Sequence, residues 1–308
     1  GYCSLKANTT GASNTAVGYD ALGDNTTASN NTAVGVSSLA ANTTGTEITA
    51  VGRYALKSST TGSYNSALGT NALQANTTGY NNTALGRSAM YSNTTGHTSV
   101  AVGYEALYSQ AGDAYQNVGV GTEALRNNTT GEYNSAVGYR ALYTATTAND
   151  NSAFGRESLF SNTTGASNVV MGYQAGYDNT TGNSNSFIGW RAGYENTTAS
   201  NNTALGREAL KNNTTGYDNT AVGGYALDAN TTGVGNVAVG LFSLSTNTTA
   251  TGLTAVGQKT LRNSTGANNT AVGFEALTTN TTGASNTAIG YKSGTAITTG
   301  GYNVAVGR

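Results

Sequence analysis

One stretch decides the fold of this chain: Asn14-Thr15-Ala16-Val17-Gly18-Tyr19-Asp20-Ala21-Leu22. Close variants recur to the end of the sequence, where the last copy reads Asn303-Val304-Ala305-Val306-Gly307. The glycine that ends this core motif, here called the closing glycine, returns every 17 residues with two exceptions. A short fixed period indicates one structural unit stacked on itself.

The aligned copies share the pattern Asn-Thr-Ala-Val-Gly-Tyr-x-Ala-Leu-x-x-Asn-Thr-Thr-Gly-x-x, where x varies. Alternation over Thr-Ala-Val-Gly, and again over Tyr-x-Ala-Leu, predicts two short strands. The Asn-Thr-Thr-Gly segment has turn chemistry, because Asn tolerates unusual backbone angles and Gly adopts positive φ. We therefore predict an all-β fold, a parallel β-solenoid of about eighteen 17-residue coils in one continuous domain over residues 1–308. At about 4.8 Å per coil, such a rod would be on the order of 85 Å long.

Two coils depart from the period, and they test the alignment. One step between closing glycines has 18 residues and another has 16. The long coil carries its extra residue in Tyr108–Tyr115, and the short coil loses one between Leu261 and Asn263. Both changes fall in predicted turns, as a solenoid requires.

Exchanges of side-chain volume predict the core. In two coils the Leu of the pattern is replaced by Gly176 and Gly193, while the Ala of the strand becomes Val170 and Phe187. A large residue at the Ala position thus accompanies the loss of the large residue at the Leu position. This exchange indicates that the Ala and Leu positions share one packed interior.

The strand residues beside the inward Ala should point outward, and they too are apolar. A continuous apolar strip is rarely left in water, so we expect chains to associate along this face. The alternative is that the faces are inverted and the small Ala/Gly strip is exposed. The predicted self-association face comprises Val17, Val34, Val51, Leu68, Leu85, Val102, Val137, Phe154, Met171, Ile188, Leu205 and Val222.

The first position of the repeat, the leading asparagine, is Asn in 15 of 18 copies, and Ile48, Ser99 and Leu253 replace it. Stacked amides at one pitch can hydrogen-bond in a ladder. Replacement by Ile and Leu predicts that this position is at least half buried.

A second asparagine begins each Asn-Thr-Thr turn, and we call it the turn asparagine. Each begins an Asn-x-Ser/Thr sequon on a predicted surface turn. Turn chemistry is sufficient to explain these residues, and glycan attachment is the alternative. The candidate sites are Asn8, Asn25, Asn42, Asn76, Asn93, Asn128, Asn162, Asn179, Asn196, Asn213, Asn230, Asn247, Asn263 and Asn280.

Two further columns carry charged and aromatic side chains. The x of Tyr-x-Ala-Leu alternates in sign through residues such as Glu123, Arg140 and Glu157, which predicts a solvated ladder that sets coil register. The position after the closing glycine alternates between aromatic residues and arginine, as at Tyr173 and Trp190. Such a column can stack on itself, or it can present a strip for surface glycans.

Composition excludes several functions. Charged residues make up 9% of the chain and the net charge is −1, so no electrostatic footprint for nucleic acid exists. The only cysteine is Cys3 and the only histidine is His97, which leaves neither a disulfide framework nor a catalytic triad. We expect no enzymatic activity, metal or cofactor, and no apolar run is long enough to span a membrane.

Residues Ser99-Val100-Ala101-Val102-Gly103 and Asn286-Thr287-Ala288-Ile289-Gly290 resemble the Ser-Val-Ala-Ile-Gly repeats of trimeric autotransporter adhesin heads of the YadA type. The Asn-Thr-Ala-Val-Gly-Tyr-x-Ala-Leu repeats are also similar to those of bacteriophage tail fibres. The resemblance covers essentially the whole chain. It implies a left-handed parallel β-roll, a homotrimer, and an extracellular, cell-surface or virion location.

These observations predict a structural extracellular fibre or adhesin segment without catalysis. A bacteriophage tail-fibre shaft and an ice- or surface-binding solenoid are the alternatives. The chain begins at Gly1, inside a repeat, so we expect a piece of something longer. Neither end carries a polar cap, which predicts end-to-end continuation, as longer chain or as stacked protomers.

Overall fold

The computed structural model describes residues 1–308, and its regular structure consists of strands alone. The chain divides into two compact units, Gly1–Ser152 and Ala153–Arg308, and the boundary falls within strand β9 (Ser152–Phe154). The repeat continues in sequence through both units.

The first unit contains β1 (Thr15–Val17), β2 (Thr32–Val34), β3 (Thr49–Val51), β4 (Ser66–Leu68), β5 (Thr83–Leu85), β6 (Val100–Val102), β7 (Val118–Val120) and β8 (Ser135–Val137). The second contains β10 (Val169–Met171), β11 (Ser186–Ile188), β12 (Thr203–Leu205), β13 (Thr220–Val222), β14 (Val237–Val239), β15 (Thr254–Val256), β16 (Thr270–Val272), β17 (Thr287–Ile289) and β18 (Val304–Val306).

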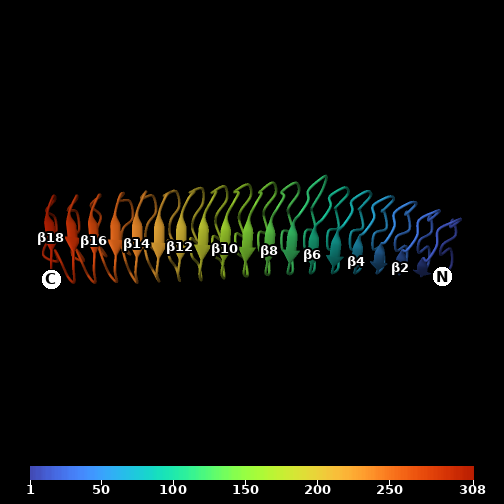
Figure 1. Ribbon diagram of the computed structural model, residues 1–308, viewed down its shortest axis with the longest axis horizontal. Coiled ribbons are helices and arrows are strands. Elements are labelled where there is room, and N and C mark those ends of the chain that lie inside the picture. Colours follow the sequence, from blue (N-terminus) through green and yellow to red (C-terminus); the bar gives the residue numbers. More distant parts are fainter. The chain divides into compact units, whose positions relative to one another are not determined.

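Each coil of either unit contributes one three-residue strand, and successive strands lie side by side in chain order (Figure 1). In the first unit β1 pairs with β2 in parallel, with Ala16 opposite Ala33. In the second, β12 pairs with β13 in the same register, with Ala204 opposite Ala221. Equivalent residues of the repeat therefore stack in columns. The predicted all-β parallel β-solenoid is confirmed.

The prediction of a second strand over Tyr-x-Ala-Leu in each repeat is wrong. In the first complete repeat, φ is 56° at Asp20 and 50° at Leu22, and left-handed residues cannot continue a strand. Ala21 and Leu22 are consecutive and both fully buried, which the period-two alternation of a strand does not allow. The segment still hydrogen-bonds to its neighbour, because the N–H of Leu22 donates to the carbonyl of Ser38 at 3.0 Å. Hydrogen bonding between coils thus continues around a corner that is not a strand.

The closing glycine turns the chain directly after the strand. At Gly86 φ is +140°, which L side chains rarely adopt. A Cβ at this position would lie 2.4 Å from the carbonyl oxygen of Gly103 in the next coil. Backbone conformation and close coil stacking both require glycine here, which explains why it marks the period.

The Ala and Leu positions form the core, as predicted. Ala141 and Leu142, for example, have no exposed surface. Val170 and Phe187 are equally buried, and a Cβ on Gly176 would lie 3.1 Å from the Phe187 ring. Phe187 therefore occupies space that leucine fills in other coils, and the expected exchange of volume is confirmed.

The long coil accommodates its extra residue in the predicted turn, whereas the deletion lies elsewhere than predicted. Gln110 takes the place of the turn asparagine, and its N–H donates to the carbonyl of Leu107 as a turn asparagine does. In the short coil Ser264 takes that place, because its N–H donates to Leu261. The missing residue is therefore one threonine of the Thr-Thr pair, after Ser264. Asn263 is exposed and is not a turn asparagine of the repeat.

Candidate interaction surfaces

The predicted self-association face lies on the outward side of the strands. Its most exposed members include Val17, at 57%, and Leu68, at 48%. The larger residues of the column in both units are exposed, and the valines of β2, β3, β6, β8 and β13 are half-buried. The faces are therefore not inverted, because the strand alanines lie inside. No charged residue occupies the outward positions of any strand.

A hollow lies on this face in the first unit. Strands β3, β4 and β5 line it, and its volume is about 340 Å³. Ser66, Leu68 and Leu85 are among the residues that line it. Strand β4, at its centre, has a small outward residue at Ser66 and a large one at Leu68.

The turn asparagines lie inside the coils, which corrects the expectation that they face solvent. Of the fourteen, only Asn263 is exposed and only Asn8 is half-buried; the other twelve have no exposed surface. In a typical case, Nδ2 of Asn196 donates to Oδ1 of Asn179 at 2.8 Å and to the carbonyl of Ala199 at 3.0 Å. A glycan on such a nitrogen would replace one of the two N–H groups that make these bonds, and the fully buried side chain leaves it no route to solvent in the folded coil.

These amides form the ladder that was predicted for the leading asparagines. In the second unit the ladder is unbroken from Asn162 to Asn247. The leading asparagines from Asn31 to Asn286 are also buried, whereas Asn14 is half-buried and Asn303 is exposed, and these amides bond chiefly to backbone. Oδ1 of Asn31 accepts from the N–H of Ile48 at 3.0 Å, and its Nδ2 donates to the carbonyl of Gly45 at 2.9 Å. Asn31 thus connects its coil to the next, and Asn202 and Asn219 make the same bonds in the second unit.

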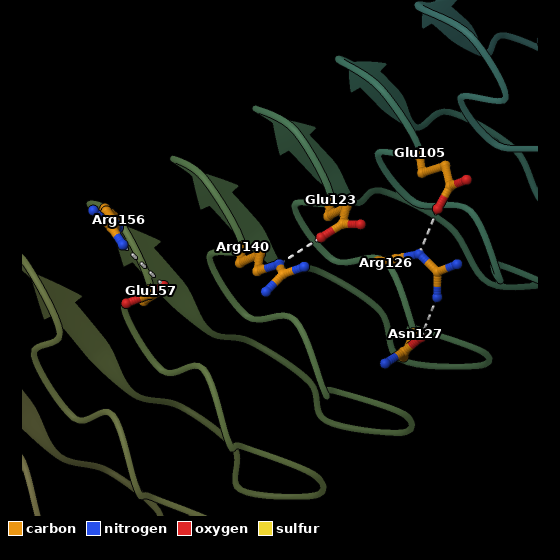
Figure 2. Close-up of polar contacts among 7 residues, drawn as sticks. All are labelled: Glu105, Glu123, Arg126, Asn127, Arg140, Arg156 and Glu157. Carbon is orange, nitrogen blue, oxygen red and sulfur yellow. Dashed lines mark hydrogen bonds and ion pairs between the residues drawn. The ribbon is translucent and has the colours of Figure 1, made fainter.

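The charged column forms the predicted ladder over part of its length. In the second unit Glu275 lies 3.6 Å from both Lys259 and Lys292, in the preceding and following coils. Nε of Arg140 lies 2.5 Å from Oε2 of Glu123 in the preceding coil (Figure 2). Glu105 instead pairs at 2.6 Å with Arg126, which follows a core leucine, and Arg126 also donates to Asn127 (Figure 2). Burial would raise the pKa of Glu105, but hydrogen bonds from Tyr104 and Arg126 bring it below its ordinary value. These pairs set neighbouring coils in register.

A longer contact between opposite charges lies within one coil of the second unit. There Nη2 of Arg156 lies 3.5 Å from Oε1 of Glu157, its neighbour in the chain (Figure 2). Because this pair does not link two coils, it contributes nothing to register.

The aromatic column after the closing glycine stacks on itself. Tyr173 and Trp190 have ring centroids 6.4 Å apart and planes at 18°. Arg156 covers Tyr173 at 5.5 Å, and Arg207 covers Trp190 at 5.1 Å. Each ring therefore has neighbours on both faces and turns its edge outward. A sugar ring packs on an open aromatic face, so this geometry favours structural stacking over the glycan strip.

Two other aromatic columns are not among those predicted from the sequence. After the core leucine position, Phe160, Tyr177 and Tyr194 stack with centroids 5.0 and 5.2 Å apart. On another side of the first unit, His97 lies between Tyr80, at 4.6 Å, and Tyr115, at 5.1 Å. The signal was present, because these residues recur at the coil period in positions that the pattern leaves variable.

No group of three or more His, Cys, Asp or Glu side chains is placed to hold a metal ion. No helix has the length and apolar character needed to cross a membrane. Comparison with models of known protein families finds no match, and the search of curated proteins returns no relative.

Proposed function

We propose that this chain is a structural, non-catalytic segment of an extracellular fibre or adhesin and that it associates with copies of itself through the outward strand face. The observation that carries the proposal is the exposed apolar column that includes Leu68, Leu85, Met171 and Leu205. Soluble monomers seldom expose contiguous apolar surface of this extent. The repeated coils also offer no unique cluster of reactive side chains.

The composition of the strands supports association of copies in register. The strands that begin with Ser end in a residue larger than Val in three cases of four, as in Ser66–Leu68 and Ser186–Ile188. Of the five strands that begin with Val, only one ends in a residue larger than Val. If the first column of one copy packs on the third column of another at the same level, a small residue meets a large one. The hollow at Ser66 would then receive the leucine of the neighbouring β4.

Analytical ultracentrifugation tests the association. We expect a trimer, and we expect Leu68→Lys with Leu85→Lys to give a monomer with an unchanged circular dichroism spectrum, because buried unpaired charge opposes assembly. The control is Tyr217→Lys, which adds charge at an exposed turn and should leave the trimer intact. A monomeric wild-type chain would contradict self-association.

The resemblance to adhesin-head and tail-fibre repeats supports the extracellular or virion location. The test is antibody labelling of intact source cells and of virions. Labelling without permeabilisation is expected, and labelling only after lysis would oppose the proposal. Detection on virions alone would favour the tail-fibre shaft.

A further inference from the structure

We propose that Tyr115 and Tyr133 form an oxidative cross-linking site, at which a peroxidase-type oxidant joins the two rings as dityrosine. Tyr115 lies within the 18-residue coil, the longest of the repeat, and Tyr133 lies in the next coil. A covalent bond there would fasten neighbouring coils at an irregular point in the stack.

The two tyrosines are held in contact. The hydroxyl of Tyr133 donates to the hydroxyl of Tyr115 at 2.9 Å, and the ring centroids lie 5.2 Å apart at 78°. His97 stacks on Tyr115 at 5.1 Å and fixes the orientation of its ring. Tyr133 is 47% exposed and is therefore accessible to an oxidant. Reacting groups held in contact need little reorganisation before they combine.

The surroundings also provide for the proton that leaves an oxidised tyrosine. Hydrogen bonding with Tyr133, burial and a hydrogen bond to Glu132 together raise the pKa of Tyr115 to about 12. Tyr115 accepts from Tyr133, so its own proton remains available, and the nearby Glu132 carboxylate that helps to raise the pKa of Tyr115 is the candidate acceptor. Removal of an electron from Tyr115 can then pass that proton to Glu132 and leave a neutral radical.

The reaction balances with hydrogen peroxide as the oxidant. Each phenol loses one electron and one proton, and the two radicals join through a carbon–carbon bond ortho to the oxygens. The two ring hydrogens at the new bond return as phenolic protons. Hydrogen peroxide takes up the two electrons and two protons and becomes two molecules of water.

The test oxidises the purified chain with a haem peroxidase and hydrogen peroxide, followed by dityrosine fluorescence and peptide mass spectrometry. We expect a linked peptide pair containing Tyr115 and Tyr133, and loss of this pair in Tyr133→Phe. The matched control is Tyr64→Phe, because Tyr64 is at least as exposed as Tyr133, has a similar positive φ and stacks on no other ring. Absence of the Tyr115–Tyr133 linked peptide from the oxidised wild-type chain, or links spread over all exposed tyrosines, would overturn the proposal.

Two further measurements separate alternatives. Oxidation of mixed light and heavy isotope-labelled chains should give only light–light and heavy–heavy links, and mixed links would show that the bond joins different chains, against the proposal. Glu132→Gln should slow the reaction without changing its product. An unchanged rate would overturn the role of Glu132 as proton acceptor.

Discussion

Phe187 fills the space that a side chain at residue 193 would need: a Cβ on Gly193 would lie 2.7 Å from three carbons of the Phe187 ring. Both positions belong to the same coil, at its strand alanine and core leucine positions. The coil thus reaches the usual core volume with the large and small residues exchanged. Tight packing of this kind makes the two positions depend on each other.

The pair therefore predicts a compensating mutation. Phe187→Ala should destabilise the fold by about 3–5 kcal/mol through the cavity it leaves. Adding Gly193→Leu should recover most of that loss, because φ at Gly193 is +59°, close to the value at the core leucines. Gly193→Leu alone should clash with the ring. Denaturant unfolding of the four proteins measures the coupling, and additive effects would contradict a shared core.

The closing glycines should tolerate no side chain. Gly86→Ala combines a positive φ with a contact against rigid backbone, so we expect a loss of about 3 kcal/mol or more. The control is Gly224→Ala, where a Cβ meets only the tip of Leu241, at 3.3 Å. Thermal melting compares the two. Equal melting temperatures would show that the coils can move apart at Gly86.

Interrupting the amide ladder should destabilise the fold by more than the loss of one small side chain suggests. Asn196→Ala removes the bonds to Asn179 and Ala199 and deprives Asn213 of one of its two acceptors. We expect a loss of about 2–4 kcal/mol, because buried polar partners become unsatisfied. The neighbouring Asn212→Ala, at a half-buried position outside the ladder, should change stability little. Chemical denaturation distinguishes them, and similar losses would argue against the ladder as a stabilising element.

Because of Asp228, we expect the free energy of unfolding to fall as pH rises. Burial raises the pKa of Asp228 to about 6, and its Oδ1 has no hydrogen-bond partner. The folded-state pKa lies above the ordinary 3.8, so protonated Asp228 contributes fully to the stability of the fold below pH 3.8. This contribution is lost as pH rises through about 6.

The matching variant is Asp228→Asn. It should stabilise the chain at pH 8 by about 1 kcal/mol after allowance for solvent screening, and it should have no effect near pH 4. Melting curves across this pH range measure the difference. Asp218→Asn, at an exposed turn, is the control and should show no such trend.

The sequence by itself determined the solenoid, its period and its core. Equivalent residues stack in every coil, so a position that is ambiguous in one repeat is settled by comparison with the other repeats. The sequence also indicated the outward apolar face. Alternation misled at Tyr-x-Ala-Leu, because left-handed residues at Asp20 and Leu22 produce a corner that leaves the same polar pattern as a strand.

Only the tertiary structure decided where the polar side chains lie. Asn-Thr-Thr reads as a surface turn, yet Asn196 is buried because the adjacent coil supplies a partner for its amide. The contact between Tyr115 and Tyr133 likewise needs two coils, since the residues are 18 positions apart in sequence. A repeat pattern describes one coil, whereas hydrogen bonds and ring contacts between coils depend on how closely the backbones stack.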